Sequence, residues 1–194
     1  KRQLLDSIRL EQQRIRKIEI AMRDFKESTI ETHYNVTIKS VPGCKILSLR
    51  KTVADYYCEG RLWEQLYAFV REEQIKLSPG TNNLAIYHNG GTTEDGVDIE
   101  VGVMVEREGA DKGGFCYRET EAVEDMACIM VYGPYENIGL SYHAFACWME
   151  EHSQYEIAGP SRQICHIGSW DESDSQKFLT EVQTPVRRIL TLTP

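Results

Sequence analysis

Residues 1–29 carry a heptad pattern, in which apolar side chains recur at alternating spacings of four and three. No glycine or proline interrupts this stretch, and the positions between are mostly Arg, Lys, Gln and Glu. The pattern predicts a long coiled-coil dimerisation helix, although an amphipathic helix packed on its own domain has the same spacing. The seam positions are Leu4, Ile8, Glu11, Ile15, Ile18, Met22 and Phe25.

After residue 33 the pattern changes to short strands, with one amphipathic helix between two pairs of strands. The Val-Pro-Gly-Cys sequence at 41–44 is typical of a tight turn, so we expect the first two strands to form a hairpin. The first half, residues 33–106, therefore has the order ββαββ. Its predicted strands are 34–40, 45–49, 83–87 and 97–105, and its predicted helix is 59–76.

The same order returns in a second half, residues 115–190. The sequence 66–72 of the first predicted helix resembles 145–151 of the second, and 100–105 resembles 181–186. We therefore predict an α+β domain over residues 33–190, in which duplicated ββαββ halves form one antiparallel sheet with the helices on one face. A cleft between the halves is the expected small-molecule site. The second half has predicted strands at 115–121, 127–132, 163–168 and 178–186, and a predicted helix at 138–152.

The net charge of −8 is distributed unevenly along the chain. Residues 1–26 hold eight basic and four acidic side chains, so the remainder carries −12. An acidic globular part repels nucleic acid, and any contact with DNA has to come from the first segment or from sequence outside this chain. The sequence starts without a methionine or a helix N-cap, and we expect it to be part of a longer protein.

The sequence lacks the features that are typical of several classes of protein. No apolar run approaches the roughly 18–20 residues of a membrane span and no signal peptide opens the chain, so we expect a cytoplasmic protein without membrane contact. The cysteines and histidines lack the spacing of zinc ligands. The motifs of lipase-type hydrolases, P-loop proteins, Rossmann proteins and zinc proteases are missing too. We predict no metal and no cofactor.

Four features together resemble a known family: the leading heptad helix, the Glu-Val-Gly-Val-Met-Val strand at 100–105, the Tyr87 strand with its polar loop, and the closing Glu-Val-Gln-Thr-Pro-Val at 181–186. This order is similar to the effector-binding domains of multidrug-sensing MerR-type regulators, whose fold is shared with gyrase-inhibitory-protein-like domains and some AraC-type activators. The resemblance implies a homodimer through residues 1–29 and a DNA-binding domain outside this chain. It also implies a groove for lipophilic, often cationic, aromatic compounds, with an acidic residue that complements their charge.

Glu181 is the first choice for that acidic residue, and Glu100 is its equivalent in the first half. Strand alternation puts Glu181 on one face and its neighbours Thr180 and Val182 on the other, without indicating which face borders the cleft. Both glutamates face water in the ordinary case. If Glu181 is buried, its carboxylate needs a cation or a hydrogen-bond donor, and an organic cation would serve.

Aromatic side chains supply the rest of such a site, because rings stack on planar ligands and attract cations. For each of these residues, packing in the core explains the sequence as well as ligand contact does. The candidates lie on both predicted helices, on one strand and in the loop after another: Trp63, Tyr67, Tyr87, Tyr142 and Trp170.

Two other functions stay open at this point. Some proteins with this fold are hydrolases that open strained electrophilic natural products, and in this chain Glu181 would act as the general base that activates water. Another binding role, such as haem binding or inhibition of a partner protein, is the third reading. The heptad helix favours the regulator, since an isolated hydrolase has no need of it.

Overall fold

The computed structural model describes residues 34–78, 83–88 and 96–189. The chain divides into two compact units, 1–34 and 35–194, and the fold described here is that of the second. The predicted dimerisation helix at 1–29 lies outside the described residues.

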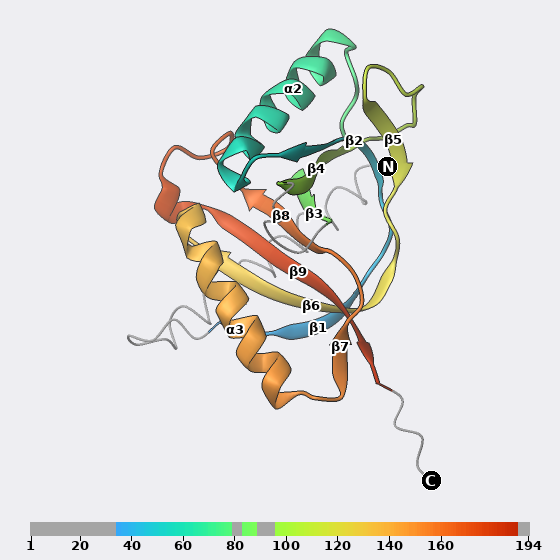
Figure 1. The fold of residues 1–194 in the computed structure, drawn as a ribbon. Coiled ribbons are helices and arrows are strands. Elements are labelled where there is room, and N and C mark those ends of the chain that lie inside the picture. The colour runs from blue at the N-terminus through green and yellow to red at the C-terminus, as the bar shows by residue number, and fades with distance from the viewer. Residues whose placement is uncertain (1–33, 79–82, 89–95, 190–194) are drawn as a thin grey trace, which may run out of the picture. The chain divides into compact units, whose positions relative to one another are not determined.

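The second unit is built on one antiparallel sheet with two α-helices (Figure 1). The strand order is β1-β6-β9-β8-β3-β4-β2-β5, and β7 pairs with β9 in addition. The helix α2 contacts β2 and β4, whereas α3 contacts β6 and β9. The strands are β1 (Thr37–Val41), β2 (Lys45–Val53), β3 (Asn83–Tyr87), β4 (Val97–Met104), β5 (Phe115–Glu119), β6 (Val123–Tyr132), β7 (Tyr155–Ile157), β8 (Ser161–Ile167) and β9 (Leu179–Arg188). The helices are α2 (Glu59–Glu72) and α3 (Ile138–Glu151), with single turns of 3-10 helix at η1 (Tyr56–Cys58), η2 (Tyr135–Asn137) and η3 (Ser175–Lys177).

The predicted α+β class and the antiparallel sheet are confirmed, but the predicted hairpin is wrong. The strand β1 pairs with β6, and β2 pairs with β4 and β5; Figure 1 shows the blue β1 beside the yellow β6. The two connections, 42–44 and 120–122, instead contact each other. The Cys44 amide donates to the Thr120 hydroxyl at 3.0 Å, and the Thr120 amide donates to the Cys44 carbonyl at 2.8 Å. A Cβ on Gly43 would lie 2.5 Å from the Thr120 carbonyl oxygen, so the Pro-Gly sequence serves this close approach and not a hairpin turn.

The helix α2 follows a capped turn and packs its apolar side on the sheet. The Asp55 carboxylate accepts a hydrogen bond from the Cys58 amide at 3.2 Å and caps the turn that precedes the helix. Leu62 and Leu66 are the buried residues of this helix, and they pack in one cluster with alternate residues of β4 such as Val101. Because strand side chains alternate between faces, the same packing directs Glu100 to the opposite side of the sheet.

Candidate functional site

A groove of about 1890 Å³ lies between α2 and α3, above a floor formed by β3, β8 and β9. The registers place alternate residues of these strands in rows across the floor, so that both halves of the chain contribute to it. Part of the floor is polar, which is unusual for residues that face two helices. The floor residues that line the groove are Asn83, Ala85, Tyr87, Ser161, Gln163, Cys165, Thr180 and Thr184.

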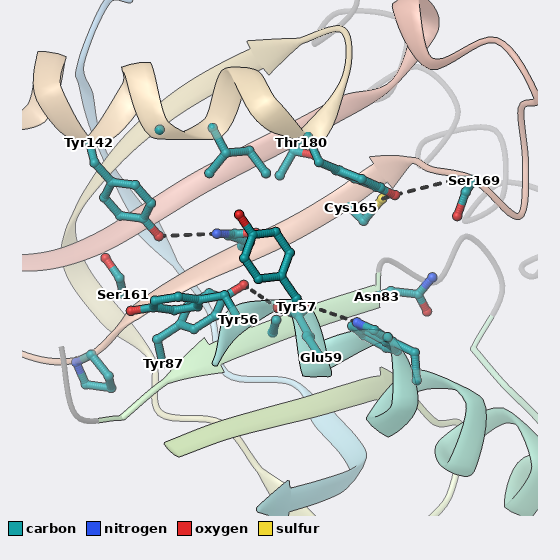
Figure 2. Close-up of a pocket in the computed structure, with 18 of the residues that line it drawn as sticks. Tyr56, Tyr57, Glu59, Asn83, Tyr87, Tyr142, Ser161, Cys165, Ser169 and Thr180 are labelled. Carbon is teal, nitrogen blue, oxygen red and sulfur yellow. Dashed lines mark hydrogen bonds between the residues drawn. The ribbon is translucent and has the colours of Figure 1, made fainter. Parts of the chain in front are cut away.

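Glu59, in the first turn of α2, places a fixed carboxylate at one side of this groove. Its Oε1 accepts a hydrogen bond from the indole nitrogen of Trp63 at 2.9 Å, and its Oε2 accepts one from the Tyr87 hydroxyl at 2.8 Å (Figure 2). Burial, and then the nearby carboxylate, raise the pKa of Tyr87 well above its ordinary value, so the phenol stays protonated and keeps donating. One helix residue and one floor residue thus orient the same negative charge.

Aromatic rings gather next to this carboxylate. Trp63 and Tyr67 of α2 meet Trp170, from the loop after β8, with ring centroids 5.8 Å and 6.0 Å from that of Trp170. The Tyr67 hydroxyl donates to the side-chain oxygen of Asn83 at 2.7 Å, and burial raises the pKa of Tyr67 to about 12. The trio therefore presents neutral rings, whose negative faces attract cations.

The other wall of the groove is neutral and polar. Tyr142 reaches from α3 into the groove toward Ser161 (Figure 2), and its hydroxyl accepts a hydrogen bond from the Gln163 amide at 3.3 Å. Burial raises the pKa of Tyr142, so this phenol is also protonated at neutral pH. Ser161 and Thr184 share a hydrogen bond at 2.7 Å across β8 and β9.

The structure brings five of the seven predicted site residues together in the groove lining: Trp63, Tyr67, Tyr87, Tyr142 and Trp170. It does not bring Glu100 and Glu181 there. Since Thr180 and Thr184 line the groove, alternation along β9 turns Glu181 to the opposite face, and Glu100 lies on that face of β4. The structure therefore places both glutamates outside this groove.

Each of the two glutamates has a cationic partner within the protein. Glu100 is 3% exposed, accepts hydrogen bonds from Arg118 at 2.7 and 2.6 Å, and lies 2.8 Å from the His88 ring nitrogen. Burial alone raises the pKa of Glu100, but the hydrogen bonds, with that from Arg118 the strongest, hold it at about 2.

Glu181 has a matching arrangement in the second half. It is 1% exposed, pairs with Lys39, and lies 2.9 Å from the His166 ring nitrogen. Burial opposes ionisation, yet His166 and Lys39 together lower the pKa of this carboxyl. The cation that a buried Glu181 requires is thus supplied by β1. A general base at Glu181 has no access to the groove, so the hydrolytic mechanism predicted with it is not supported.

Sequence reasoning missed Glu59 and Gln163. Glu59 stands four residues before Trp63, a spacing that puts both side chains on one face of a helix, and this signal was available. Gln163 gave no local signal, because its place at the centre of the floor depends on strand pairing.

In the part of the chain that the structure describes, no group of three or more His, Cys, Asp or Glu side chains is arranged to hold a metal ion. No helix among the described residues combines the length and the apolar character that crossing a membrane requires.

Comparison with known proteins places this fold in context. The model of the GyrI-like small-molecule binding domain matches residues 34–187. The crystal structure of the EcmrR C-terminal domain is similar, with a TM-score of 0.69 and 23% identity over 80% of this chain and 99% of that one. EcmrR in a cryo-EM structure of its DNA complex has a TM-score of 0.74 and 23% identity, over 93% of this chain and 70% of that one.

A more distant likeness is SAV2435 bound to tetraphenylphosphonium, with a TM-score of 0.56 and 11% identity over 79% of this chain and 93% of that one. A search of curated protein sequences finds no match. The predicted likeness to gyrase-inhibitory-protein-like domains is confirmed by the domain match, and the similarity to EcmrR shows the same fold.

Proposed function

Because this chain belongs to the family of GyrI-like small-molecule binding domains, we propose that its groove binds lipophilic cations that carry aromatic rings. The observation that carries the proposal is the Glu59 carboxylate, which Trp63 and Tyr87 orient beside the aromatic trio. In this proposal Glu59, which lines the groove, is the acidic residue that complements the positive charge of the ligand, in place of Glu181 and Glu100. That SAV2435, a protein of the same fold, was solved with tetraphenylphosphonium supports this ligand class.

The free energy of binding comes from the attraction between the charges and from contacts with the aromatic rings. A cation about 5 Å from a carboxylate gains roughly 3 kcal/mol at an effective dielectric constant of about 20, and exposure of the groove to water reduces this to about 1–2 kcal/mol. A cation over the aromatic rings gains about 0.5–2 kcal/mol more. Loss of the Glu59 charge is therefore expected to weaken binding about tenfold.

The first experiment is a titration with tetraphenylphosphonium, followed by tryptophan fluorescence, since Trp63 and Trp170 line the groove. We expect Glu59→Gln to weaken binding about tenfold and to leave the affinity for neutral triphenylphosphine oxide unchanged. The matched control is Glu72→Gln, at an exposed position of the same helix that does not line the groove. Equal affinity of wild type and Glu59→Gln for the cation, or no binding by the wild type, would contradict the proposal.

We further propose that the domain is the ligand-sensing and dimerising part of a transcription regulator, whose DNA-binding domain lies outside this chain. The acidic charge of the residues after 26 and the heptads of residues 1–29 support this division of roles. The strand order supports the proposed duplication of ββαββ halves. If β1, β2, β3 and β4 of the first half correspond to β5, β6, β8 and β9 of the second, exchanging the two sets gives the same strand order counted from the opposite edge of the sheet.

Dimerisation through residues 1–29 is tested by sedimentation equilibrium on the whole chain. We expect a dimer at micromolar concentration, and a monomer after the double substitution Ile15→Asp and Ile18→Asp, which puts charge into the apolar seam. The control Gln13→Asp lies outside the seam and is expected to remain dimeric. A monomeric wild-type chain would refute this part of the proposal.

A further inference from the structure

The centre of the groove floor is occupied by Gln163. Its register partners on the two sides are Ala85 in β3 and Val182 in β9, which are 3% and 2% exposed. The longer Gln163 side chain is only half-buried and lines the groove. A primary amide thus stands above apolar neighbours at the middle of the floor, where a bound molecule has to cover it.

The hydrogen bonds of Gln163 leave part of this amide unused. Its nitrogen donates to the Tyr142 hydroxyl at 3.3 Å, and its carbonyl oxygen accepts no hydrogen bond from any residue that the structure describes. A rotation of the amide by half a turn exchanges the oxygen and the nitrogen, so one polar group is left over in either orientation. The neighbouring hydroxyls have other partners, since Ser161 and Thr184 share a hydrogen bond at 2.7 Å and Ser161 also bonds to Tyr142.

Covering an unpaired amide group with hydrocarbon costs about 1–3 kcal/mol, whereas a ligand group that completes the hydrogen bond avoids this cost. One wall and the floor of the groove therefore favour different parts of one molecule. The Glu59 side, with Trp63 and Tyr87, suits an aromatic cation. The central Gln163, held by Tyr142, suits an uncharged hydrogen-bonding group such as an amide or a hydroxyl.

We propose that Gln163 is a specificity-determining residue, which selects aromatic cations that also carry an uncharged hydrogen-bonding group over cations built of hydrocarbon alone. This inference rests on the proposed function, since it names a second contact of the same ligand. It separates the groove into a charge-binding end at Glu59 and a polar centre at Gln163.

The test uses two phosphonium cations of the same size and shape, 3-carbamoylpropyl-triphenylphosphonium and 4-methylpentyl-triphenylphosphonium, which differ by a carboxamide in place of an isopropyl group. Affinities are measured by tryptophan fluorescence for the wild-type chain and for Gln163→Met, which keeps the length of the side chain without its amide. We expect Gln163→Met to weaken binding of the carboxamide about tenfold and to leave the affinity for the hydrocarbon cation unchanged or higher. The control Gln176→Met replaces an exposed glutamine outside the groove lining and is expected to change neither affinity.

The possible results separate this inference from the proposed function. If Gln163→Met changes both affinities by the same factor, Gln163 does not determine specificity, while cation binding by the groove stands. If the wild-type chain binds neither cation, the proposed function fails together with this inference. A second variant, Gln163→Ala, is measured in the same way with far-UV circular dichroism as a check of folding, and the same difference between the two cations is expected from it.

Discussion

The buried carboxylate of Glu100 makes stability depend on pH in a way that one substitution can isolate. In the folded chain Arg118 and His88 contact this carboxylate, and its pKa is about 2 instead of the ordinary 4.5. A group with a lowered pKa in the folded state stabilises the fold at every pH above its unfolded pKa. This stabilisation is lost as the pH falls from about 4.5 toward 2, because the unfolded chain then binds the proton more readily.

The magnitude follows from the two pKa values. The difference of about 2.5 corresponds to roughly 3 kcal/mol at neutral pH, at about 1.4 kcal/mol for each pKa unit. About 2 kcal/mol of this is lost by pH 3, where the carboxyl of the unfolded chain is largely protonated and that of the folded chain is still ionised. We therefore expect Glu100→Gln to be less stable than wild type by about 3 kcal/mol at pH 7 and by about 1 kcal/mol at pH 3.

Urea unfolding at pH 7 and pH 3, followed by circular dichroism, measures both differences. The control Glu124→Gln, at an exposed position of β6, is expected to match wild type at both pH values. If Glu100→Gln and wild type differ by the same amount at pH 7 and pH 3, ionisation of Glu100 does not carry the stabilisation and the reasoning is refuted.

Three further substitutions test the packing of the sheet and of α2, each measured by urea unfolding. Leu66→Ala removes a fully buried side chain of α2 and is expected to cost about 2–5 kcal/mol, and a cost below about 1 kcal/mol would mean that α2 does not pack on the sheet as described. Lys39→Met removes a cationic partner of the buried Glu181 and is expected to cost about 1–2 kcal/mol, since His166 remains; an unchanged midpoint would show that Lys39 does not hold this carboxylate. Gly96→Ala is expected to destabilise by more than about 1 kcal/mol, because Gly96 has a φ of +98° and a Cβ there would lie 2.4 Å from the Val53 carbonyl oxygen; a variant as stable as wild type would contradict this backbone geometry.

Much of the local structure was predictable from patterns within short windows. The apolar stripe of Leu62 and Leu66 predicted α2, and the alternating residues of 178–186 predicted the strand β9. The aromatic candidates were predicted with them, because Trp63 and Tyr67 flank the apolar stripe of a helix that has to cover a sheet. These predictions succeed because helix and strand periodicity depend on neighbouring residues alone.

The tertiary structure decided which strands are neighbours and which face of the sheet binds. The turn sequence at 41–44 was compatible with a hairpin, but β1 pairs with β6 because long-range burial selects the partner. Alternation separates Thr180 from Glu181 without indicating which of them faces the helices. Only the packing of α2 and α3 on one side of the sheet turned Glu181 toward Lys39 and left Glu59 and Gln163 in the groove. The sequence by itself therefore determined the helices and strands and which residues of a strand share a face. Contacts between residues far apart in the chain determined which of the two faces the helices cover.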